Sequence, residues 1–170
     1  MNLGKWKEWL DGHAKRSGSL AGAAPAVGRG SAHDKVFGAL IMLVDDEPLA
    51  LEVTQVHLED AGFSRFLSTS QPAKALAMMQ DRRPDILLLD LMMPEVTGFD
   101  ILASMEATRI LKDLPTIVLT SSGDPQSRLK ALDLGITEFL VKPVDPVELV
   151  LRVSNTLAAK AYWQGCWVSR

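Results

Sequence analysis

Five short strand-like runs alternate with longer stretches of helical periodicity along residues 39–159. The strand-like runs are Leu40–Val44, Phe63–Ser68, Ile86–Leu89, Thr116–Leu119 and Phe139–Val141. The helical stretches extend from Pro48 to Gly62, Gln71 to Arg83, Gly98 to Lys112, Pro125 to Gly135, and from Pro146 onward. This alternation is typical of parallel strands joined by right-handed helical crossovers. It predicts one α/β domain whose sheet carries helices on both faces.

The helical stretches carry apolar residues that gather on one face. These residues are Leu49, Val53 and Val56 in the first helix; Phe99, Leu102, Met105 and Ile110 in the third; and Leu149, Val150, Val153 and Leu157 in the last. They recur at the spacing of three and four that brings side chains to the same side of a helix. We expect the faces of the third and last helices to pack on the sheet.

Residues 1–38 form an N-terminal extension that differs in composition from the rest of the chain. The segment 18–31 is rich in Gly, Ala and Ser, which is linker composition. Before it, Trp6, Trp9, Leu10 and His13 share one helical face, which predicts a short amphipathic helix over 5–14. Such a helix would dock on a partner or on a membrane surface. The alternative is a frayed tail, because helices this short are marginally stable alone.

The C-terminal residues 160–170 have two interpretations. They are either a tail or the start of a linker helix that prolongs the last helix of the domain. In the second case we expect Gly165 to end the helix.

Composition and charge narrow the classes of protein. A chain of 170 residues that is 47% hydrophobic is long enough for one domain with a full core. A formal net charge of -3 gives no support for direct nucleic-acid binding. Cys166 is the single cysteine, so no internal disulfide and no zinc site are expected. No apolar run approaches the roughly 20 residues that span a bilayer, and we expect a cytoplasmic protein.

Charged and hydroxyl residues stand where the predicted strands end. Asp45 and Asp46 follow the first strand, Asp90 the third, Thr120 the fourth and Lys142 the fifth. The carboxyl ends of parallel strands meet at one edge of the sheet, where open α/β sheets place their sites. Three carboxylates that lie close together repel one another unless a cation joins them. The arrangement predicts a divalent metal ion and a chemical role for one aspartate.

These motifs, in this order and at these spacings, resemble the receiver domain of two-component response regulators, as in chemotaxis receivers. The motifs are Asp45-Asp46-Glu47, Asp90, Met93-Pro94 followed by Gly98, Thr120, and Lys142-Pro143. The resemblance covers about residues 39–159. It implies a flavodoxin-like (βα)5 doubly wound parallel sheet with strand order 2-1-3-4-5, which places strands one, three, four and five side by side.

The resemblance also implies the role of each site residue. Asp90 is then the phosphoacceptor, and Mg²⁺ (or Mn²⁺) is bound by Asp45, Asp46, Asp90 and the backbone carbonyl of Met92. Thr120 and Lys142 contact the phosphoryl group. Thr120 and Phe139 form an aromatic switch, although Phe139 has the alternative of being an ordinary core residue. The Lys142-Pro143 bond is expected to be cis.

The implied function is a phosphorylation-controlled signalling switch rather than an enzyme with its own substrate. A histidine kinase or a phosphotransfer protein supplies the phosphoryl group, and the domain assists its own phosphorylation and slow dephosphorylation. The face formed by the fourth helix, fifth strand and last helix then controls a homodimer, another partner or an output domain. The chain is expected to be a stand-alone receiver or the amino-terminal part of a longer regulator. The alternative function is a receiver-like scaffold that binds partners without phosphate.

Overall fold

One five-stranded parallel sheet organises the protein, in a computed structural model that describes residues 36–121 and 123–167. The strands are β1 (Leu40–Val44), β2 (Arg65–Thr69), β3 (Ile86–Asp90), β4 (Thr116–Thr120) and β5 (Glu138–Val141). Their order is β2-β1-β3-β4-β5, and every neighbouring pair is parallel. The predicted strand order is therefore confirmed. The helix expected over 5–14 and the linker over 18–31 lie outside the described residues.

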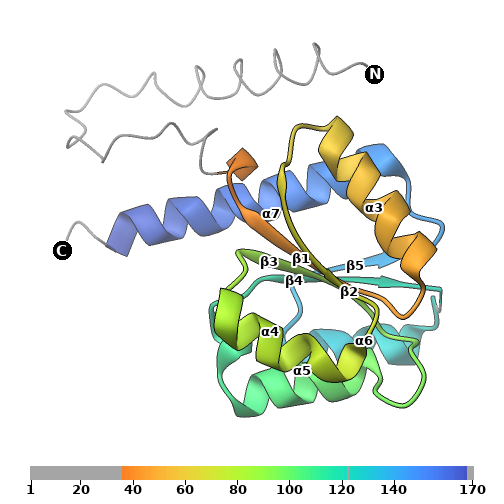
Figure 1. Cartoon of the computed structure of the whole chain (residues 1–170). Coiled ribbons are helices and arrows are strands. Elements are labelled where there is room, and N and C mark those ends of the chain that lie inside the picture. The colour runs from red at the N-terminus through yellow and green to blue at the C-terminus, as the bar shows by residue number, and fades with distance from the viewer. Residues whose placement is uncertain (1–35, 122, 168–170) are drawn as a thin grey trace, which may run out of the picture.

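Helices cover both faces of the sheet (Figure 1). One face carries α3 (Pro48–Asp60) and α7 (Pro146–Trp167); the other carries α4 (Ala75–Arg82), α5 (Gly98–Ala107) and α6 (Pro125–Asp133). Two short 3-10 turns, η1 (Pro72–Lys74) and η2 (Ile110–Lys112), complete the connections. The alternating pattern predicts helices on both faces, and the resemblance to receiver domains implies this doubly wound, flavodoxin-like arrangement. Among the described residues, no helix combines the length and apolarity needed to cross a membrane.

The central strands β1, β3 and β4 are buried along their whole length. Strands covered by helices on both faces read as continuous apolar runs, because neither side of the strand meets water. Alternate residues enter two separate cores: Ile41 and Leu43 pack with residues of α3 and α7, and Met42 and Val44 with residues of α4 and α5. The carboxyl ends of these strands are thereby held rigidly in register.

Two of the predicted helices are shorter than expected. The stretch 98–112 divides into α5 and η2 because Arg109, with φ of 61°, adopts a left-handed conformation that interrupts the helical hydrogen bonds. The stretch 71–83 opens with η1 and ends at Arg83, which has φ of 45° and precedes Pro84. The expected buried residues Leu102 and Met105 are confirmed, whereas Phe99 and Ile110 are only partly buried.

The apolar face of α3 lies in solvent. Leu49, Val53 and Val56 are 62%, 46% and 45% exposed. The helix instead buries Leu58, and Leu51 is partly buried against the same core. By contrast, the inward face predicted for the last helix is confirmed, because Leu149, Val150, Val153 and Leu157 are buried in α7.

Both ends of the domain reach further than the sequence indicates. Val36 is buried in the core, and the ring of Phe37 lies 4.9 Å from that of Phe63, so packing begins before residue 39. At the other end, α7 does not stop at Gly165 but continues to Trp167. A glycine inside a helix costs only about 0.5–1 kcal/mol relative to alanine, which a long helix tolerates. The last helix of the domain is therefore prolonged into the C-terminal residues.

Gly98 is required where the loop after β3 enters α5. A Cβ atom there would lie 2.2 Å from the carbonyl oxygen of Asp90 and 2.7 Å from the Cα of Leu91. Thr97 and Asp100 fix the same turn with a reciprocal capping box, in which each side chain bonds the other residue's backbone N–H. The close approach holds Asp90 against the start of the helix.

We expect Gly98→Ala to lower the free energy of unfolding by about 1–3 kcal/mol or more, because the backbone must move to relieve the overlap. Urea denaturation measures this loss. The control is Gly123→Ala, whose Cβ would lie 3.6 Å from Cγ2 of Val141, an ordinary contact. That variant should stay within about 0.5 kcal/mol of the wild type. Equal losses in the two variants would contradict the steric explanation.

Candidate functional site

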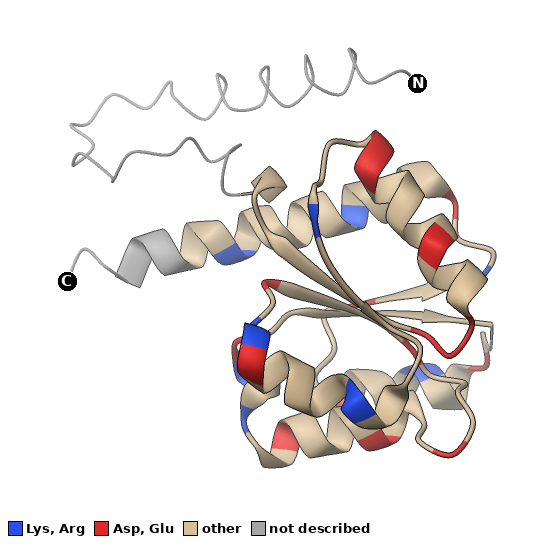
Figure 2. Ribbon diagram, viewed as in Figure 1, with Lys and Arg blue, Asp and Glu red and all other residues tan. Residues whose placement is uncertain are grey.

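Three aspartates converge at the carboxyl edge of the sheet. Val44 pairs with Leu89 in the β1–β3 ladder, so Asp45 and Asp90 are the next residues along adjacent strands. Carboxylate oxygens of Asp45, Asp46 and Asp90 all lie within 4.8 Å of one another. Asp45 and Asp90 are 7% and 5% exposed, and Asp46 is half-buried. Figure 2 shows acidic residues in the loops beyond this edge. The sequence predicted this cluster, and the structure brings all three together.

Lys142 reaches the aspartates from the end of β5. Its Nζ donates to Oδ2 of Asp45 at 2.6 Å and lies 3.4 Å from Oδ2 of Asp90. Burial opposes the charge on Lys142, but the hydrogen bond to Asp45 and the charges of Asp45 and Asp90 outweigh it and raise the pKa of Lys142. The ammonium therefore stays charged and links two strands. The peptide bond that follows, Lys142-Pro143, is cis.

Asp45 uses its two oxygens for different purposes. Its Oδ1 accepts the backbone N–H of Glu47 at 3.0 Å, which fixes the turn before α3, while Oδ2 accepts from Lys142. The Asp45 side chain therefore joins the turn before α3 to the charged cluster.

Asp90 is incompletely satisfied in the described structure. Its Oδ1 is buried and has no hydrogen-bond partner. The pKa of Asp90 is raised, mainly because the carboxyl group is buried and also because the charge of Asp45 lies nearby. Lys142 and the backbone N–H of Met92 act in the opposite direction but do not cancel this rise. A buried acceptor without a partner costs about 1–3 kcal/mol. An unpartnered carboxylate oxygen among further carboxylates is the donor set that Mg²⁺ prefers, so the residues fit a magnesium ion.

Thr120 and Phe139 lie on β4 and β5, the two strands that follow β3 in the sheet. Thr120 ends β4 and is fully buried, and it pairs in register with Val141. Phe139 pairs with Val118 and is half-buried against the core under α5 and α6. The ring is covered from outside by Arg128, whose Cζ lies 5.7 Å from the ring centroid. Sequence reasoning missed Arg128, because it stands at an ordinary polar position of a polar helix.

The side chain of Met92 points outward beside this cluster. It is 54% exposed, two residues after Asp90. The Met92 N–H acts on the Asp90 carboxylate, as the pKa of Asp90 reflects. Thr97, which differs from the Asp common at that position in receivers, caps α5 rather than entering the cluster.

The fold and this edge define a class of doubly wound α/β domain that carries a cluster of three aspartates, suited to a metal ion, with a lysine beside it. The family model for the response regulator receiver domain matches residues 41–154. The chain belongs to the response regulator receiver family. Its acidic cluster accords with the phosphoacceptor function of that family in two-component signal transduction.

Relatives of known name support the assignment. The chain is 34% identical over 122 residues to the phosphate regulon transcriptional regulatory protein PhoB of Pseudomonas aeruginosa, covering 72% of this chain and 53% of PhoB. It is 28% identical to the chemotaxis protein CheY4 of Vibrio cholerae, with a TM-score of 0.63, covering 71% of this chain and 98% of that one. The BeF3-activated DrrB receiver domain is 27% identical with a TM-score of 0.62, covering 71% and 97%. The chain spans about half the length of the curated relative PhoB.

The raised pKa of Asp90 predicts a stability gain on neutralisation. Because this pKa is higher in the folded than in the unfolded chain, ionised Asp90 costs stability above the folded pKa. In Mg²⁺-free buffer with EDTA, we expect Asp90→Asn to raise the free energy of unfolding at pH 7. The gain should disappear as the pH falls through the folded pKa towards 3.8, the ordinary pKa of an aspartate.

Asp100 provides a control of opposite sign for the same urea titrations. Hydrogen bonds from Thr97 lower the pKa of Asp100, so its ionised form stabilises the folded protein. Asp100→Asn should therefore lose stability at pH 7, and this loss should vanish as the pH falls below its folded pKa. If both variants changed stability in the same direction at pH 7, the account of Asp90 would be wrong.

Proposed function

We propose that Asp90 accepts a phosphoryl group from a histidine kinase or a histidine phosphotransfer protein. The observation that carries this proposal is the buried Asp90 carboxylate, with one oxygen unpartnered and the other beside Lys142. Receivers of this family interact with such phosphate donors. The Asp90 oxygen forms a bond to phosphorus while the bond from phosphorus to the donor's histidine nitrogen breaks, and that nitrogen takes up a proton.

The reacting groups are both anionic, so catalysis rests on positioning and charge neutralisation. Lys142 supplies a fixed positive charge within 3.4 Å of Asp90. Thr120, at the end of β4, is proposed to donate its hydroxyl to a phosphoryl oxygen. Asp45 orients Lys142 through the 2.6 Å hydrogen bond, which keeps the ammonium at the rim rather than in solvent.

Asp45, Asp46, Asp90 and the backbone carbonyl of Met92 are the groups that would hold Mg²⁺ or Mn²⁺. When bound, the ion supplies positive charge that offsets repulsion among the carboxylates and the incoming phosphoryl group. The three carboxylates provide oxygen ligands close enough to share one ion. Met92 also presents an exposed apolar side chain at the mouth, and we infer that it slows attack by water on the acyl phosphate.

The phosphoryl group is proposed to act on the α6, β5 and α7 face through Thr120 and Phe139. Thr120 moves towards the phosphoryl oxygens, and the Phe139 ring turns into the space beneath it. This face carries exposed apolar side chains on all three elements: Leu129 and Leu132 on α6, Val141 on β5 and Val147 on α7. Exposed apolar residues gathered on neighbouring elements indicate an interaction surface.

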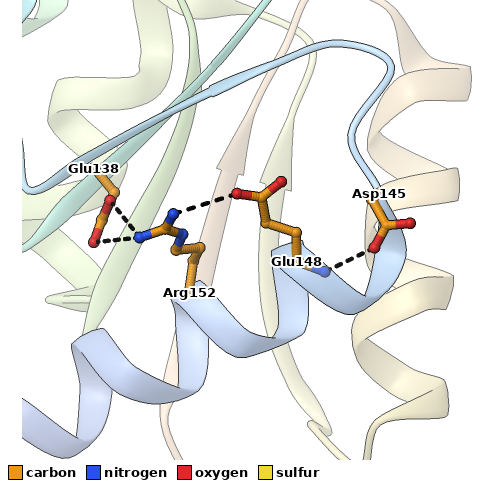
Figure 3. Close-up of polar contacts among 4 residues, drawn as sticks. All are labelled: Glu138, Asp145, Glu148 and Arg152. Carbon is orange, nitrogen blue, oxygen red and sulfur yellow. Dashed lines mark hydrogen bonds and ion pairs between the residues drawn. The ribbon is translucent and has the colours of Figure 1, made fainter. Parts of the chain in front are cut away.

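Polar contacts hold β5 and α7 together within that face (Figure 3). Arg152 of α7 lies 3.3 Å from Oε2 of Glu138 on β5 and 3.4 Å from Oε1 of Glu148. Asp145 accepts the backbone N–H of Glu148 at 2.9 Å and starts the helix. We propose that this face, supported by these contacts, forms a homodimer or meets an output domain. We also propose that the phosphate donor contacts the exposed face of α3 that carries Leu49, Val53 and Val56, since this helix begins two residues after Asp46. The protein is proposed to work in the cytoplasm.

Intact mass after incubation with acetyl phosphate tests the phosphoacceptor. We expect one phosphoryl adduct that requires Mg²⁺, is absent in Asp90→Ala and is retained in Asp60→Ala, the same change at an exposed aspartate of α3. A phosphoryl adduct in Asp90→Ala would assign the acceptor to another residue. A folded protein that takes up no phosphoryl group and binds no Mg²⁺ would favour the phosphorylation-independent scaffold.

Sedimentation with Mg²⁺ and beryllofluoride tests the dimer face. Leu129 and Leu49 are equally exposed, at 61% and 62%, but lie on α6 and α3. We expect beryllofluoride to drive wild type and Leu49→Asn towards a dimer, and Leu129→Asn to dimerise about ten-fold more weakly, since a lost anchor costs more than about 1 kcal/mol. Dimerisation weakened only by Leu49→Asn would place the interface on α3.

A further inference from the structure

Helix α6 is held to the domain by little apolar burial. Ala131 is its buried residue, while Leu129 and Leu132 are turned to solvent. The preceding helix, α5, buries Gly98, Ile101, Leu102 and Met105. A helix that buries one methyl group has no deep hydrophobic anchor, because stabilisation by burial scales with apolar area. Other contacts must therefore set its position.

Two cations of α6 lie over aromatic rings of the neighbouring elements. Lys130 places Nζ 4.3 Å from the ring centroid of Phe99 on α5, and Arg128 places Cζ 5.7 Å from the ring centroid of Phe139 on β5. Both distances are within the roughly 6 Å over which a cation is attracted to a ring face. Both rings are partly buried against the same core. They differ in that Phe139 is the ring proposed to turn in the switch, whereas Phe99 has no part in it.

We propose that Arg128 acts as a brake on the switch by holding the Phe139 ring in the half-buried position that it has here, beside α6. This inference rests on the proposed function, because it assigns a residue that regulates the same site. Inward rotation of the ring separates it from the Arg128 guanidinium, so the cation–π contact exists in the resting arrangement and is lost in the other. Only such a differential contact can shift a two-state balance.

If Arg128 is a brake, removing its charge should tighten anion binding at Asp90, which is the opposite of what charge attraction alone predicts. Removing the Arg128 charge takes positive potential away from the domain, which on Coulombic grounds can only weaken binding of an anion at Asp90. Releasing the ring instead raises the fraction of binding-competent protein. Loss of an exposed cation–π contact should raise this fraction about two- to five-fold. The apparent affinity for the anion should rise by the same factor, because it is proportional to the binding-competent fraction.

The experiment is a titration of the full chain with beryllofluoride at saturating Mg²⁺, followed by ¹⁹F NMR of the bound ion. We expect Arg128→Gln to bind about two- to five-fold more tightly than wild type and Arg128→Lys to lie closer to wild type, since the lysine keeps a cation. Lys130→Gln is the matched control, because it removes the same charge from the same helix over the other ring. It should bind no more tightly than wild type.

A double-mutant cycle with Phe139→Leu isolates the contact. In the leucine background, Arg128→Gln should no longer tighten binding, and ring proton shifts of Phe139 should move towards the beryllofluoride-bound position in the unliganded Arg128→Gln protein. Unchanged or weaker binding in Arg128→Gln, equal tightening in Lys130→Gln, or tightening that persists without the ring would each overturn the brake. A wild type that binds no beryllofluoride would instead refute the phosphoacceptor function itself.

Discussion

The ammonium of Lys142 offsets part of the negative charge of the aspartates at the carboxyl edge of the sheet, because it is bonded to Asp45 and lies close to Asp90. Parallel pairing makes that convergence unavoidable, because Asp45 and Asp90 continue adjacent paired positions of β1 and β3. One ammonium cannot neutralise three carboxylates. The imbalance remains on Asp90, where burial raises the pKa and one oxygen has no partner. Additional positive charge beside Asp90 would therefore be favourable.

This arrangement needs a rigid edge, and the packing supplies it. Strands buried on both faces cannot shift without exposing two cores at once, so the carboxylates keep their separation. Gly98 adds a local constraint, since its hydrogen lies where any side chain would strike the backbone of Asp90. The position of the acceptor thus depends on apolar strands and on the absence of one side chain.

The sequence predicted the strands and the site cluster because each depends on strong local signals, whereas the order of the strands followed from the resemblance to receiver domains. Buried strands such as Ile86–Asp90 are continuous apolar runs, and the chemical residues stand directly at their ends. Features that depend on tertiary fit were less accessible. Arg109 interrupts a helix through a left-handed backbone conformation, which an arginine in the sequence does not predict. Leu49 and Val53 have helical apolar spacing yet face solvent. Arg128 is on helix α6, but the ring that it contacts, Phe139, belongs to strand β5.

The two helices beside β5 differ in a way that decides which of them can respond to the acceptor. Helix α7 buries Leu149, Val150, Val153 and Leu157, each worth about 1.5–3 kcal/mol, so displacing it would cost more than the roughly 5.5 kcal/mol that reverses a 1:99 balance. Helix α6 buries Ala131 and is otherwise steadied by cation–π contacts of about 0.5–1 kcal/mol when exposed. The interactions of a charge added at Asp90 can offset the smaller free-energy cost of displacing α6. Motion should therefore pass through β4 and β5 into α6, while α7 stays in place and provides the fixed side of the surface.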